Sequence, residues 1–148
     1  MFSITQKNFW RYWLGGIMLL TILIAVGAQL KTGAVPGGLS AHQSAGSANA
    51  IDTIQAAWAA AGVIDVAKLV MAIDFIFVTV YSFGAFIGGR LFMQHQARPL
   101  RTLGGLIAFA AIVFFFTDNI ENTAQSIQLF QMKGDDTLAS LAASLGPI

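Results

Sequence analysis

Three long apolar segments restrict what this chain can fold into more than any other feature of its sequence. They cover residues 13–30, 63–93 and 102–132, and each is long enough to cross a bilayer as a helix. The composition agrees, because 56% of the residues are hydrophobic and only 10% are charged, whereas soluble domains contain about 25% charged residues. The sequence therefore predicts an all-α, polytopic membrane bundle with three transmembrane helices in a single domain of residues 1–148.

The connection between the first two segments contains a loop and one short helix. Residues 31–50 are rich in Gly, Ser and Ala, which predicts a flexible loop. We expect a helix over residues 50–61, with Asn49 as its N-cap and Asp52 as a weaker capping-box partner. Its apolar side chains recur on one face, which predicts an amphipathic helix at the membrane interface. These side chains are Ile51, Ile54 and Trp58.

The chain after the third apolar segment is too short to cross a bilayer. Its leucines at positions 138, 141 and 145 have helical spacing. We therefore expect a short tail helix over residues 136–145, capped by Asp136.

Basic residues are concentrated near one end of the predicted spans. Lys7 and Arg11 precede the first span, and three arginines lie in or beside the loop at residues 94–101. Because cytoplasmic loops carry an excess of Lys and Arg, the N-terminus and loop 94–101 are predicted to be cytoplasmic. Residues 31–62 and the tail would then face the other side.

Polar residues interrupt the second and third segments at a common depth. Measured from Arg90 and Arg101 at about 1.5 Å per residue, Asp74 lies about 24 Å and Asp118 about 25 Å into the membrane. A carboxylate inside a span is costly unless it is paired or neutral, and it tends to mark a functional site. The alternative is that the membrane simply ends at these residues. The candidate cluster consists of Asp74, Asp118, Glu121, Asn122, Lys68 and Tyr81.

Within this cluster we expect Asp118 to face the second span near Asp74, with Lys68 and Glu121 on its outer side. Two of the candidates keep a structural alternative. Lys68 can pair with Asp65 on its own helix instead of reaching Glu121, and Tyr81 can pack between helices instead of lining a cleft.

Glycines are concentrated in the other half of the predicted spans. Gly84 and Gly88 form a small-xxx-small pattern, which lets two helix backbones approach closely. Glycines in the other two segments lie at a similar depth, which predicts tight packing there. The helix-packing candidates are Gly15, Gly84, Gly88 and Gly104.

Several classes of site are disfavoured by the sequence. The chain has no cysteine, which removes thiol catalysis and thiolate metal sites. It has two histidines, His42 in the predicted flexible loop and His95 in the predicted cytoplasmic loop, which the topology places on opposite sides. We therefore expect no metal and no cofactor. The net charge is +1 and the basic residues are scattered, so no nucleic-acid partner is expected.

Three stretches together resemble a diffuse group of small bacterial polytopic membrane proteins of unknown function. They are Ala57-Trp58 with the later Gly62, Asp74-Phe75-x-Phe77-x-x-x-Tyr81, and Asp118-x-x-Glu121-Asn122. The resemblance implies a location in the bacterial inner (plasma) membrane and offers no activity to carry over. Members of this group have a fourth transmembrane helix, so either this chain departs from them with three spans or a fourth helix follows residue 148.

Two functional hypotheses remain. The first is a small, non-catalytic accessory or assembly subunit of a larger membrane complex, in contact with membrane lipids and with other subunits. Small size, helix-packing glycines and the absence of catalytic motifs favour it. The second is a small membrane enzyme, or a carrier of protons or lipids, that uses the carboxylate cluster. Whether the chain catalyses a reaction is left open.

Overall fold

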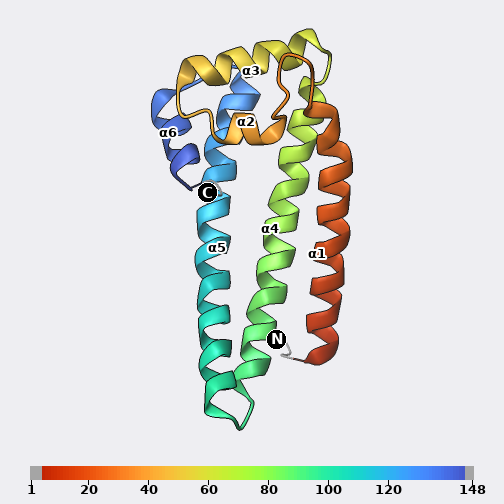
Figure 1. Ribbon diagram of the computed structural model, residues 1–148, viewed down its shortest axis with the longest axis vertical. Coiled ribbons are helices and arrows are strands. Elements are labelled where there is room, and N and C mark those ends of the chain that lie inside the picture. The colour runs from red at the N-terminus through yellow and green to blue at the C-terminus, as the bar shows by residue number, and fades with distance from the viewer. Residues whose placement is uncertain (1–4, 146–148) are drawn as a thin grey trace. The chain divides into compact units, whose positions relative to one another are not determined.

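A computed structural model describes residues 5–145, and its regular elements are all helices (Figure 1). In chain order they are α1 (Gln6–Gly27), the 3₁₀ helix η1 (Ala28–Leu30), α2 (Leu39–Gln43), α3 (Ala48–Ala60), α4 (Ile64–Met93), α5 (Arg98–Gln131) and α6 (Asp136–Leu145). α1 together with η1, α4 and α5 are long and apolar enough to cross a membrane. The prediction of an all-α helical bundle with three such helices is confirmed, and it is compatible with a multi-pass membrane protein.

The helix bounds follow the apolar segments, with two extensions. α1 begins at Gln6 rather than at residue 13, because the polar and aromatic residues before the apolar run continue the same helix. α5 begins at Arg98 rather than at residue 102. Pro99 permits this because the first turn of a helix does not need its N–H.

The segment expected to be a flexible loop is ordered by tertiary contacts. It contains α2, which buries His42 to 1% exposure, so the placement of His42 in a flexible loop was wrong. The N-cap of α3 is Ser47, whose hydroxyl accepts from the Ala50 N–H at 3.4 Å, and not Asn49. Asp52 is no capping partner either, since its carboxylate accepts from the Gly134 N–H at 2.5 Å.

The cap of the tail helix also differs from the prediction. The carboxylate of Asp135 accepts from the Leu138 N–H at 2.9 Å and caps α6. The predicted cap, Asp136, instead accepts from the Ala48 N–H at 2.7 Å. Asp52 and Asp136 fail to act as caps for the same reason, because their carboxylates accept from Gly134 and Ala48 and so fasten the segment between α5 and α6 to α3.

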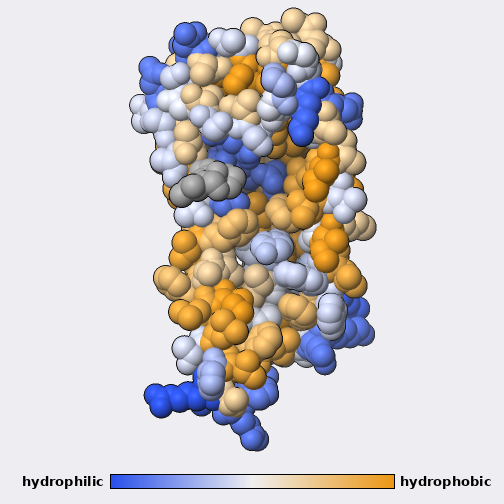
Figure 2. All heavy atoms as spheres, viewed as in Figure 1, coloured by the Kyte–Doolittle hydropathy of each residue, from blue (hydrophilic) through white to orange (hydrophobic). Residues whose placement is uncertain are grey.

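The described residues form two compact units. Unit 1 contains residues 5–20 and Ile76–Thr117, and unit 2 contains Thr21–Phe75 and residues 118–145. In the space-filling view, hydrophobic side chains cover much of the surface of the long helices (Figure 2).

Unit 1 is held together by close helix contacts at glycines. A Cβ on Gly84 would lie 3.2 Å from the Tyr12 Cβ, and a Cβ on Gly88 would lie 2.9 Å from the Phe9 ring. Between α4 and α5 the backbones themselves meet, since a Cβ on Gly104 would lie 2.5 Å from the Gly89 carbonyl oxygen. The fourth glycine named from the sequence, Gly15, makes ordinary contact with Val80.

Unit 2 contains the three short helices, and α2, α3 and α6 contact one another pairwise (Figure 1). The apolar stripe expected on α3 is present, and Ile51 and Trp58 are buried to 1% and 0% exposure within the protein. The Trp58 indole N–H donates to the Leu30 carbonyl oxygen at 2.9 Å, which ties η1 to α3. This small core holds together the segments that carry the polar residues.

Candidate functional site

One face of α5 carries a run of polar side chains into the interior of unit 2. Glu121, Asn122, Gln125 and Gln128 lie between 0% and 3% exposed. Residues three and four apart share a helix face, so Glu121, Gln125 and Gln128 form a continuous polar stripe. Burying such groups is unfavourable unless they find hydrogen-bond partners.

The stripe finds partners on two other helices. The Gln125 Nε2 donates to the Glu121 carboxylate at 2.6 Å. The Gln125 Oε1 lies 3.5 Å from the His42 Nδ1, and the His42 Nε2 lies 3.2 Å from the Gln55 Nε2. A chain of side-chain contacts therefore runs from α5 through α2 to α3.

The partners of His42 fix its protonation. Because the Gln125 amide nitrogen is committed to Glu121, its oxygen accepts from Nδ1–H, and the Gln55 amide donates to Nε2. Nδ1 then carries the only ring proton, and the imidazole is neutral. Burial lowers the pKa of His42 to about 4, although the hydrogen bond with Gln125 opposes this shift. His42 also stacks on the Trp58 ring, with centroids 5.4 Å apart.

Gln128 has a different role, which is to fasten the end of α5. Its Nε2 donates to the Ala124 carbonyl oxygen at 3.1 Å, and its Oε1 accepts from the Asp135 N–H at 3.0 Å. Gly134 allows this turn to approach α3, because a Cβ there would overlap the Ala48 carbonyl oxygen. The end of α5 is thus positioned by backbone contacts that only glycine permits.

The structure brings together four of the residues named from the sequence. Asp74 and Asp118 lie close enough to Glu121 for their charges to act on it, and the Asn122 amide group faces the Asp74 carboxylate. However, the Asn122 Nδ2 completes no hydrogen bond of ordinary geometry, although the side chain is 2% exposed. Neither Asp74 nor Glu121 makes an ion pair with a basic side chain in the described part of the chain. The cluster therefore combines carboxylates with a buried amide group.

Lys68 and Tyr81 take the structural alternative that the sequence left open. The Lys68 ammonium pairs with Asp65 at 3.5 Å and lies 5.8 Å from the centroid of the Phe130 ring, so it does not cap the carboxylates. Tyr81 belongs to unit 1, where it packs against the rings of Trp13, Phe77 and Phe114.

A cleft in unit 2 reaches Asp74. Its volume is about 380 Å³, and it opens beside the end of α1 and the segment that leads into α2. Its lining residues are Leu23, Ile24, Gly27, Ala28, Lys31, Gly37, Leu39, Ser40, Gln43 and Asp74. Asp74 therefore faces both the polar cluster and an accessible space.

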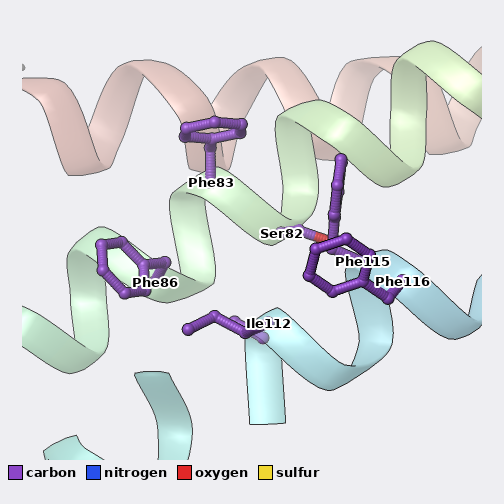
Figure 3. Close-up of a pocket in the computed structure, with 7 residues that line it drawn as sticks. Ser82, Phe83, Phe86, Ile112, Phe115 and Phe116 are labelled. Carbon is purple, nitrogen blue, oxygen red and sulfur yellow. The ribbon is translucent and has the colours of Figure 1, made fainter. Parts of the chain in front are cut away.

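A second cleft, in unit 1, lies between α4 and α5 and is lined mainly by aromatic rings (Figure 3). Its volume is about 250 Å³. Its single polar side chain is Ser82, whose buried hydroxyl has no hydrogen-bond partner. The lining residues are Ser82, Phe83, Phe86, Ala111, Ile112, Phe115 and Phe116. Without a titratable side chain, this cleft offers no acid–base chemistry.

No protein family, known protein or solved structure matches this chain. Among residues 5–145, no group of three or more His, Cys, Asp or Glu side chains is arranged to hold a metal ion.

The histidine and glutamine part of the network was not predicted from the sequence. Gln125 and Gln128 follow Glu121 at helical spacing, so this periodicity was a usable signal. His42 and Gln55 had no such signal, because they join the network only through the packing of α2 and α3.

Proposed function

We propose that this chain is a small, non-catalytic accessory or assembly subunit of a larger membrane protein complex. Its spanning helices have little protein around them. Only 11% of the apolar stretch of 18 residues in the first span is buried within the protein, and the corresponding shares are 33% for α4 and 17% for α5. Helices with so much apolar surface require lipid or other protein around them.

The pattern on α5 favours a protein partner for part of this surface. Leu106, Phe109, Val113 and Phe116 are spaced by alternating steps of three and four residues and are 63%, 65%, 43% and 59% exposed. This is the a/d spacing that packs one helix against another in left-handed pairs. We call these four residues the α5 seam. Their exposure at this spacing is the observation that carries the proposal.

Cross-linking can test whether the α5 seam contacts another subunit. A photoreactive amino acid at Phe109 should give a discrete cross-linked protein band in native membranes. The control position is Met18, which is 60% exposed on α1. Adducts to lipid alone at Phe109, or the same bands from both positions, would contradict a specific seam.

We also propose an orientation in the bacterial inner membrane, with the N-terminus and loop 94–101 in the cytoplasm. The distribution of Lys and Arg supports it. Gly33→Cys and Gln96→Cys place thiols at exposed positions, and an impermeant reagent should label only Gly33→Cys in intact cells. Labelling of both positions from outside, or of Gln96→Cys alone, would overturn the orientation.

A carrier of protons or lipids is the second candidate. It is favoured by the carboxylates near Glu121 and by the buried Asn122 amide that faces Asp74. If the cluster transfers protons, Asp118→Asn should abolish proton flux into vesicles that contain the purified protein, while leaving its melting temperature nearly unchanged. No proton flux with the unmodified protein would remove proton transfer as a function.

A further inference from the structure

The cleft beside Asp74 has the features of a built ligand site. Its volume of about 380 Å³ falls within the range of small-molecule sites, roughly 300–1,000 Å³. Apolar side chains of Leu23, Ile24 and Leu39 form much of its wall, and a few polar groups converge on the same space. This combination of an apolar wall with a small number of polar groups is typical of ligand sites.

Two opposite charges line this cleft and do not pair with each other. Asp74 is half-buried and Lys31 is exposed, and neither makes an ion pair in the part of the chain that the structure describes. The Lys31 side chain passes over Gly38, where an added Cβ would lie 2.9 Å from its Cγ. The neutral Asn122 amide faces the Asp74 carboxylate but does not neutralise its charge. A carboxylate inside a membrane span is costly without an opposite charge, so a ligand with a positive group would relieve that cost at Asp74.

The lining indicates which kind of cation fits. Quaternary ammonium groups are typically bound by aromatic rings, and none of the lining residues is aromatic. A primary ammonium instead donates three hydrogen bonds. Asp74, Ser40 and Gln43 line the cleft, and their carboxylate, hydroxyl and amide oxygen can accept such bonds.

The other end of the ligand follows from Lys31 and from the apolar wall. The Lys31 ammonium can bind a phosphate or carboxylate group of the ligand. Leu23 and Ile24 belong to the first span, so an apolar part of the ligand can lie against them in lipid. We propose that the cleft binds an aminophospholipid, phosphatidylethanolamine, with its ammonium at Asp74, its phosphate at Lys31 and an acyl chain along Leu23 and Ile24. The proposal concerns binding and is compatible with either role above.

Native mass spectrometry of the delipidated full chain in detergent tests this proposal. Phosphatidylethanolamine, phosphatidylcholine and phosphatidylglycerol with identical acyl chains are added at equal concentrations. The phosphatidylethanolamine adduct should dominate, and either Lys31→Gln or Asp74→Asn should reduce it about tenfold, the effect of losing one charged hydrogen bond. The control Asp65→Asn changes an exposed carboxylate of the same helix outside the cleft and should leave the adduct unchanged.

Three results would overturn the proposal. The first is equal retention of all three lipids, which would mean unspecific lipid contact. The second is an unchanged adduct in Lys31→Gln, which alters an exposed side chain and should fold even if Asp74→Asn does not. The third is displacement of the lipid by soluble phosphoethanolamine at equal concentration, which would assign the same chemistry to a water-soluble zwitterion. None of these three results would affect the cross-linking test of the α5 seam, which does not depend on lipid binding in the cleft.

Discussion

Acidification should destabilise unit 2 through a single side chain, His42. The pKa of His42 is about 4 in the folded protein, whereas an unfolded histidine has a pKa of about 6.5. Between pH 4 and pH 6.5 the unfolded chain therefore binds more protons than the folded protein does. Stability therefore falls as the pH drops through this window, and the histidine contribution is constant above and below it. The difference between the two pKa values corresponds to roughly 3 kcal/mol in the free energy of unfolding.

The variant His42→Gln isolates this contribution, because it cannot be protonated but keeps an amide that can hydrogen-bond. Chemical unfolding in detergent, followed by tryptophan fluorescence, gives the free energy of unfolding of both proteins between pH 4 and pH 8. As the pH falls from 7 to 4, the free energy of unfolding of the unmodified chain should fall by roughly 3 kcal/mol relative to that of His42→Gln. A difference that does not change with pH would show that His42 is solvated or charged in the folded protein, and would refute the hydrogen-bond network as described.

Three further substitutions test the packing. Gly104→Ala should lower the free energy of unfolding by about 1–3 kcal/mol, because the added methyl group would overlap Gly89. Gly105→Ala should cause no loss, because the space beside Gly105 is open. Equal effects of the two substitutions would mean that the two helix backbones do not meet. Trp58→Phe should cost about 1–3 kcal/mol, because it leaves a carbonyl oxygen unpaired in the core, and a smaller loss would indicate that water replaces the indole. Ser82→Ala should leave the stability unchanged or raise it in the same unfolding assay, since the hydroxyl has no partner; a loss above about 1 kcal/mol would reveal a hidden hydrogen bond.

The long helices were predictable because a bilayer imposes a simple requirement on length and polarity. The apolar run that begins at residue 63 predicted the start of α4, at Ile64, to within one residue. α2 was not predictable, because a helix of five residues in a segment rich in Gly and Ser has no local signal. Its formation depends on the burial of His42 against Trp58, which is a tertiary contact. The caps Ser47 and Asp135 were missed for a related reason, since several neighbouring residues had equal capping ability.

The polar site was predictable in part. Equal depth along two antiparallel helices predicted that Asp74 and Asp118 lie near each other, because helical rise is nearly constant. The structure places Asn122, one helical turn beyond Asp118, against the Asp74 carboxylate. Side-chain direction was not predictable in the same way. Lys68 has a long flexible stem, and it pairs with the nearby Asp65 rather than reaching across to Glu121.

The mass of the particle extracted from native membranes tests the accessory-subunit proposal most directly. The chain, expressed at its natural level with a small affinity tag, is extracted in a mild detergent, and light scattering during size-exclusion chromatography gives the protein mass of the particle. The chain alone has a mass of 15.7 kDa. We predict a particle several times heavier that contains other membrane proteins in fixed proportion, and its mass should fall when Phe109 and Phe116 of the α5 seam are both replaced by Ala. A protein mass equal to that of one chain, or to a whole multiple of it with no other protein present, would contradict the proposal.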